Sequence, residues 1–171
     1  MYTDNPTTPI GRRVVIGQMS VFADLEVPFT GEEYVGLIWA ADSTLDEGDR
    51  MKVVGTLIDS GCQYIVCGGV DCERWHDDAD LAFANLEVQS DSLRTDLPMV
   101  MTTWHDNESM EDVAFFAINC TNFDDHDFNR LLVLVVGQES ERLDCVNRIS
   151  RVLRAPAGTQ TDPSTPTGSV L

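Results

Sequence analysis

Four short and almost wholly apolar runs, separated by amphipathic segments, limit the folds open to this chain more than any other feature. They read YVGLIWA, CQYIVCGG, LPMVMTTW and RLLVLVVG, at residues 34–40, 62–69, 97–104 and 130–137. Continuous apolar runs of this length are typical of strands that are buried on both faces of a parallel sheet. The chain therefore has the strands of a buried sheet and needs helices to cover it.

Apolar side chains recur at helical spacing after each run, in residues 51–61, 72–88 and 140–155 and in a segment that follows Asp106 and Asn107. Asp42 or Ser43 can cap the first of these helices and Asp106 or Asn107 the third, and Gly61 is expected to end the first. Strands that alternate with amphipathic helices favour a parallel sheet with right-handed crossovers. We predict a small, doubly wound α/β domain, flavodoxin-like or Rossmann-like. Its sheet would be mainly parallel, with four to five strands and helices on both faces. For the four runs we expect the spatial order second, first, third, fourth.

The chain of 171 residues is long enough for one domain with additional terminal segments. Residues 1–33 predict an N-terminal extension that supplies an edge strand or a hairpin, and residues 34–154 the α/β domain. Residues 155–171 are rich in Pro, Gly, Ser and Thr and lack apolar periodicity, which is typical of a disordered tail.

The chain is strongly acidic, because 29 acidic and 11 basic side chains give a formal charge of −18. Such a charge repels nucleic-acid and lipid phosphates, so we expect neither nonspecific nucleic-acid binding nor membrane association. The acidity can serve solubility, or it can serve docking onto a basic protein partner.

Neither a signal peptide nor a membrane span is apparent in the sequence. The five cysteines are an odd number, and four of them lie in apolar or helical patterns. This usage predicts reduced thiols in a cytoplasmic protein.

Polar clusters follow the ends of the predicted strands, where open α/β sheets bind ligands. The most conspicuous are DCERWHDD, at residues 71–78, and TTWHD, at residues 102–106. Candidates for a catalytic role are Asp71, Glu73, His76 and His105. Candidates for ligand binding are Asp42, Gly68, Gly69, Thr103, Trp104 and Asp106.

A histidine paired with a carboxylate can transfer protons, and hydrolysis is the chemistry that we expect such a pair to serve. A site at the strand ends that uses all of these catalytic candidates requires His76, His105, Asp71 and Glu73 to converge on one concave pocket, and it fails if the two histidines lie on opposite sides of the sheet. Purely structural roles are open as well. Acidic side chains stabilise the start of a helix, Gly68 and Gly69 suit a strand-to-helix turn, and Trp104 can pack in the core.

Several common active-site motifs are absent from the sequence. It contains no G-x-G-x-x-G, phosphate-binding loop, G-x-S-x-G or H-E-x-x-H, and no paired C-x-x-C. We therefore predict no metal site and assign no cofactor. Cys72, at the start of a predicted helix, is an alternative nucleophile, since a helix N-terminus favours a thiolate.

The segments CQYIVCGGVDCERWHD, MVMTTWHDNES and LLVLVVG, in this order, resemble a group of small, uncharacterised bacterial α/β proteins. The resemblance covers roughly residues 34–154. It implies the same α/β domain with the same polar residues at the strand ends, and it implies no activity. Two functional hypotheses follow. One is a polar or nucleotide-like small-molecule site at the strand ends. The other is a non-catalytic, acidic interaction module of an immunity, antitoxin-like or regulatory kind.

Overall fold

A computed structural model describes residues 3–5, 8, 10–90, 99–123 and 127–154. The predicted tail at 155–171 and the start of the third apolar run lie outside these residues. The strands are β1 (Thr3–Asn5), β2 (Arg13–Met19), β3 (Tyr34–Ala40), β4 (Cys62–Gly69), β5 (Met101–His105) and β6 (Arg130–Val136). The helices are η1 (Phe22–Asp24), α1 (Glu47–Ser60), α2 (Cys72–Ser90), α3 (Met110–Asn119) and α4 (Glu139–Arg154).

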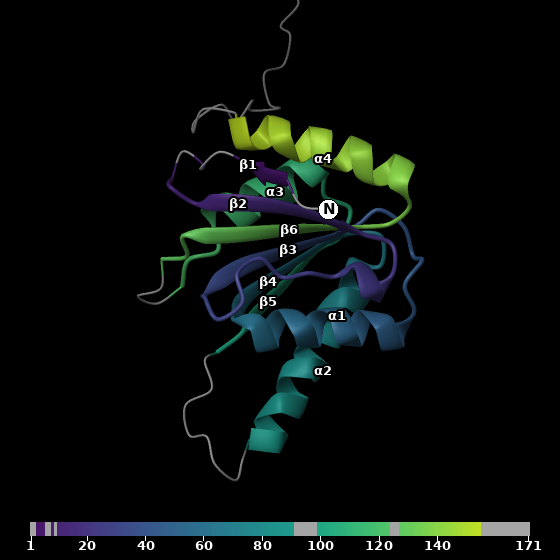
Figure 1. Ribbon diagram of the computed structural model, residues 1–171, viewed down its shortest axis with the longest axis vertical. Coiled ribbons are helices and arrows are strands. Elements are labelled where there is room, and N and C mark those ends of the chain that lie inside the picture. Colours follow the sequence, from purple (N-terminus) through teal and green to yellow (C-terminus); the bar gives the residue numbers. More distant parts are fainter. Residues whose placement is uncertain (1–2, 6–7, 9, 91–98, 124–126, 155–171) are drawn as a thin grey trace, which may run out of the picture.

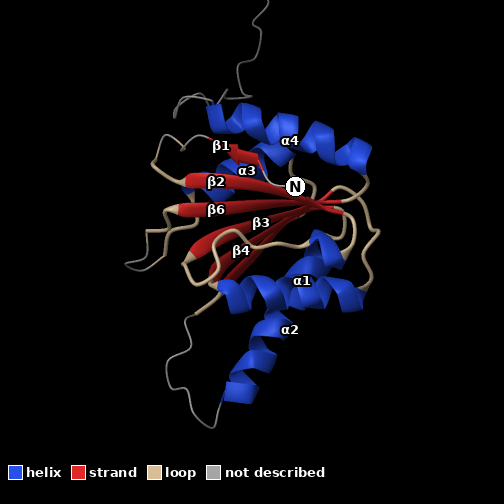
Figure 2. Cartoon of the chain, in the orientation of Figure 1, coloured by secondary structure: helices blue, strands red, loops and turns tan. Residues whose placement is uncertain are grey.

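The strands form one sheet in the order β1-β2-β6-β3-β4-β5. All neighbours are parallel except β1, which pairs antiparallel with β2 at one edge. Helices α1 and α2 cover one face and α3 and α4 the other (Figures 1 and 2). The doubly wound α/β fold predicted from the sequence is therefore confirmed.

The predicted order of the four apolar runs is wrong, because the structure places them as fourth, first, second, third. Strand β2 lies within the sheet beside β6, where it pairs from Arg13 to Met19. The segment expected to be an N-terminal extension therefore supplies two strands of the same sheet. Hydrophobic pattern identifies strands, but it carries no information on which strands become neighbours.

Alternate residues of β6 divide the core into two halves. Leu132, Leu134 and Val136 pack with α1 and α2, whereas Leu131, Val133 and Val135 pack with α3 and α4. Every one of these six side chains is buried. This is why the strand reads as a continuous apolar run, since both faces of a central parallel strand are covered.

The helix caps differ from those suggested by the sequence. The α1 N-cap is Asp46 and the α3 N-cap is Ser109, and each side chain accepts a hydrogen bond from the backbone three residues on. Asp42 and Asp106 were plausible caps by residue type, but each lies too early in the chain. Gly61 ends α1 in the left-handed conformation, as predicted.

Two buried arginines connect parts of the fold. Arg50 of α1 contacts Asp78 of α2 at 2.6 Å, with both side chains nearly buried. Arg12 donates to the Ala117 carbonyl and the Thr121 hydroxyl at the end of α3, each at 2.6 Å. Burial lowers the pKa of Arg12. Each guanidinium has partners for its N–H groups, as a buried charge requires.

Candidate functional site

The strand order reverses between β3 and β6. These strands are neighbours, but β3 leads into α1 on one face and β6 into α4 on the other. Open α/β sheets bind ligands at such points, beyond the carboxyl ends of the strands. An open pocket of about 760 Å³ lies there, over the ends of β3, β4 and β5 and beside α4. Its volume suits a small organic ligand.

The position of Trp39 in the pocket wall depends on a glycine. Gly68 of β4 pairs laterally with Trp39 of β3 and with His105 of β5. A Cβ at Gly68 would lie 2.9 Å from the Trp39 ring and 3.0 Å from Val113. The indole can occupy the space over Gly68 only because that residue has no side chain. The glycine therefore sets the position of the pocket wall.

The chain leaves β4 through two left-handed residues. Gly69 has φ +85° and Asp71 has φ +56°. A Cβ at Gly69 would lie 2.1 Å from the Ala40 carbonyl oxygen, so no larger residue fits. Asp71 lines the pocket, and its carboxylate is 3.6 Å from the exposed Arg74 guanidinium. Aspartate tolerates the left-handed region better than most residues do.

His105, the last residue of β5, lies at the pocket with its side chain only 9% exposed. Its ring packs against Phe116 of α3, with centroids 4.5 Å apart. Glu108 Oε2 lies 3.1 Å from Nδ1, in an orientation that does not make a hydrogen bond, and Nε2 has no partner among the described residues. A buried imidazole with unsatisfied nitrogens is costly, and in native proteins it calls for an explanation.

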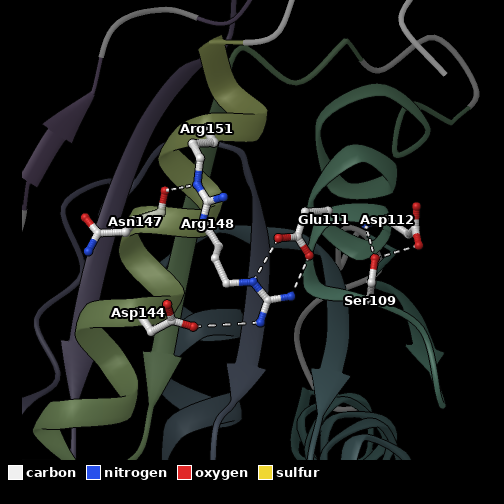
Figure 3. A network of polar contacts seen from close by, with 7 residues as sticks. All are labelled: Ser109, Glu111, Asp112, Asp144, Asn147, Arg148 and Arg151. Atoms are coloured by element: carbon white, nitrogen blue, oxygen red, sulfur yellow. Dashed lines mark hydrogen bonds and ion pairs between the residues drawn. The ribbon is translucent and has the colours of Figure 1, made fainter. Parts of the chain in front are cut away.

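Opposite the strand ends, α4 contributes Asp144 and Arg148 to the pocket. Arg148 donates to Glu111 of α3 through Nε at 2.8 Å and Nη2 at 2.6 Å, and Asp144 lies 3.9 Å away (Figure 3). This contact lowers the pKa of Glu111 and raises that of Arg148. Arg148, the one arginine or lysine that the described residues contribute to the lining, is therefore already held between two carboxylates.

The sequence-derived candidates divide into two groups. His105, Asp71, Asp106 and Gly69 lie at the pocket. Thr103 lies two residues before His105 on β5 and so faces the same side of the sheet. Thr103 is not part of the pocket lining, so four of the ten candidates come together there, without the His76 and Glu73 that the predicted site also required.

The second group lies on the opposite face of the sheet. The His76 ring contacts Trp104 at 4.5 Å, on the side covered by α2. Trp104 and His105 are consecutive in β5, so their side chains point to opposite faces. The prediction that His76 and His105 face each other is therefore wrong. His76 lies 3.4 Å from Asp77 and 3.6 Å from Asp80. It is therefore a histidine on a helix face, beside neighbouring carboxylates.

Three other candidates are not part of the pocket lining. Glu73 is exposed on the first turn of α2. The Asp42 carboxylate accepts hydrogen bonds from the Thr44 hydroxyl and from the Gln138 backbone N–H, so it connects the loops after β3 and β6. Cys72 is buried, and burial raises its pKa, which argues against a nucleophilic thiolate.

The sequence reasoning missed Trp39, Glu108, Asp144 and Arg148, all of which line the pocket. Trp39 lies inside an apolar strand and resembles any core aromatic. Asp144 and Arg148 lie at i and i+4 on α4, a spacing that is common for pairs on a helix surface. Only the observed packing of α4 beside the strand ends brings them to the site.

None of the helices in the described part of the chain is long and apolar enough to cross a membrane. Within the same part, no three metal-binding side chains gather closely enough to hold an ion.

No curated protein matches the chain. A family model described as "Domain of unknown function (DUF7684)" matches residues 19–156, which include strands β3 to β6 and helices α1 to α4. The match agrees with the resemblance seen in the sequence to an uncharacterised group, and it begins earlier, at the end of β2. The chain belongs to this family.

Proposed function

We propose that this domain binds a small polar molecule in the pocket at the carboxyl ends of β3, β4 and β5. The observation that carries the proposal is His105. Its side chain is nine-tenths buried at the pocket, and its Nε2 has no partner among the described residues. A ligand that draws the ring towards the pocket and supplies a hydrogen bond, directly or through a water, would remove the cost of that unsatisfied group.

Binding is better supported than catalysis. The Glu108 carboxylate lies 3.1 Å from Nδ1, as in the histidine–carboxylate pairs that serve proton transfer. Both ring nitrogens are nevertheless shielded from solvent. Proton transfer to a substrate, including hydrolysis, would need the ring to turn towards the pocket. The proposal is therefore a binding site whose chemistry, if it has any, would use His105 with Glu108.

A ligand-dependent shift of the melting temperature tests the proposal. We would screen polar metabolites and nucleotides against the wild type and against His105→Phe and His76→Phe. His105→Phe keeps an aromatic ring against Phe116 but removes both nitrogens, whereas His76→Phe makes the same change on the opposite face. The proposal predicts that a ligand stabilises the wild type and His76→Phe, but not His105→Phe. Equal shifts in all three proteins would contradict it.

The acidic interaction module is the second candidate, and the outer edge of the sheet favours it. Strand β5 is the last strand of the sheet in the described part of the chain, and its Trp104 side chain is 49% exposed. An exposed tryptophan beside an edge strand is a feature of binding surfaces. A basic partner protein that binds there should be released by Trp104→Ala and be unaffected by His105→Phe.

A further inference from the structure

The charges around the pocket indicate what kind of ligand it takes. Four carboxylates line it, on Asp71, Asp106, Glu108 and Asp144, and among the described side chains Arg148 is the only arginine or lysine of the lining. Arg148 already makes two hydrogen bonds to Glu111. A phosphate or carboxylate ligand would therefore meet four negative charges and a guanidinium that is already paired with another carboxylate. Such a pocket disfavours anions, including nucleotides.

The partners of the carboxylates leave them able to accept a ligand. Asp71 has a guanidinium 3.6 Å away that is 67% exposed, and Asp144 has Arg148 at 3.9 Å. Asp106 accepts from the neutral Asn107 side chain. None of these contacts neutralises its carboxylate in a close, buried pair, and exposed ion pairs contribute little.

The wall formed by Trp39 fits the same ligand. An indole beside carboxylates is a favourable environment for a positively charged nitrogen, because the ring face attracts cations. Once the His105 ring turns towards the pocket, its unpaired Nε2 can accept a hydrogen bond from an N–H donor of the ligand. A metal ion would need several ligands close together, and the described residues contain no such group.

We infer that the pocket takes a small organic cation, whose charged nitrogen lies near Trp39 and among the carboxylates of Asp71, Asp106 and Asp144. This inference rests on the proposed binding site and adds the class of ligand. It differs from the expectation of a nucleotide-like ligand. The buried, unpaired His105 distinguishes the pocket from the acidic surface in general.

Calorimetric titration with compounds of matched length tests the inference. The probes are putrescine, succinate and a neutral diol of the same four-carbon length, together with adenosine monophosphate. We expect saturable binding of putrescine alone. Asp71→Asn should weaken it by about two- to fivefold, the range for a partly exposed charge. Asparagine tolerates the left-handed conformation at position 71 as well as aspartate does, so the fold should be kept.

Asp59→Asn is the matched control, because it removes the same charge from an exposed position on α1, away from the pocket. It should leave putrescine binding unchanged. If both substitutions weaken putrescine binding equally, or if neither weakens it, the attraction is a general one to an acidic protein. Either result would overturn the inference.

Two further outcomes distinguish this inference from the proposed site. Saturable binding of succinate or adenosine monophosphate that is lost in His105→Phe would refute the cationic ligand and support the site. If no probe saturates, the cationic ligand is refuted, and the proposed site then depends on its own His105 screen.

Discussion

Replacing His105 by phenylalanine should stabilise the protein, although it alters a buried residue at the centre of the proposed site. The imidazole is buried against Phe116 with both nitrogens lacking hydrogen-bond partners. An unsatisfied buried polar group costs about 1–3 kcal/mol. Glu108, 3.1 Å from Nδ1, recovers part of that cost for one nitrogen. Phenylalanine removes the cost but is slightly larger, and overpacking takes back part of the gain.

The net expectation is a gain of about 1 kcal/mol in the free energy of unfolding. For a chain of this size, such a gain raises the melting temperature by roughly 2–4 °C. His105→Ala should instead lose about 1–2 kcal/mol, because the cavity next to Phe116 outweighs the relief of the polar cost. Urea denaturation at neutral pH measures both changes.

His76→Phe is the control for this prediction. That ring lies on Trp104 with Asp77 and Asp80 near its nitrogens, so the substitution should change stability by no more than about 0.5 kcal/mol. If His105→Phe lowers the free energy of unfolding by more than about 1 kcal/mol, the His105 nitrogens are satisfied in the free protein. That result would refute the expected gain in stability.

Three further predictions concern the surroundings of the pocket. Glu111→Gln should lose about 0.5–1 kcal/mol at neutral pH, because the carboxylate is 40% exposed. Arg148 lowers the pKa of Glu111, so its contribution is present above the unfolded pKa of about 4.5 and is lost as pH falls through the lower folded value. Denaturation at several pH values checks this, and a difference that is constant with pH would contradict it. Gly69→Ala should lose more than about 3 kcal/mol, since φ is +85° and the Cβ would collide with a carbonyl. Gly55→Ala, in open space on α1, should gain up to about 1 kcal/mol in the same melts. Mass spectrometry of the native protein after brief alkylation should find label on Cys120 alone, because the other four cysteines are buried; full labelling without denaturant would contradict this burial.

Much of the fold follows from the sequence, because burial on both faces leaves a pattern that a single chain can show. Each apolar run became a parallel strand, and Gly61 ends a helix as expected. The strand order did not follow from the sequence, since it depends on which strands become neighbours. Strand β2 was visible only as part of an ambiguous N-terminal segment. Its place beside β6 became clear only from the sheet.

The sequence predicts the location of the candidate site better than it predicts which residues line it. The rule for open sheets pointed to the carboxyl ends of the strands, where Asp71 and His105 lie at the pocket. The same rule does not specify the face, so His76 was grouped with His105 although the sheet separates them. The alternation of side chains along β5 could have shown that Trp104 and His105 point apart. Arg148 required the packing of α4, which no local pattern shows.

We expect the pocket on the α3–α4 side of the strand ends to bind a small polar ligand, and specifically an organic cation. Titration of the isotope-labelled protein with putrescine, followed by amide chemical shifts, tests it most directly. If the ligand binds in the pocket, saturable chemical-shift changes should be confined to residues 69–71, 105–108 and the adjoining turns of α4. They should be absent in His105→Phe. Shifts that spread over the acidic surfaces of α1 and α2, or that persist in His105→Phe, would contradict it.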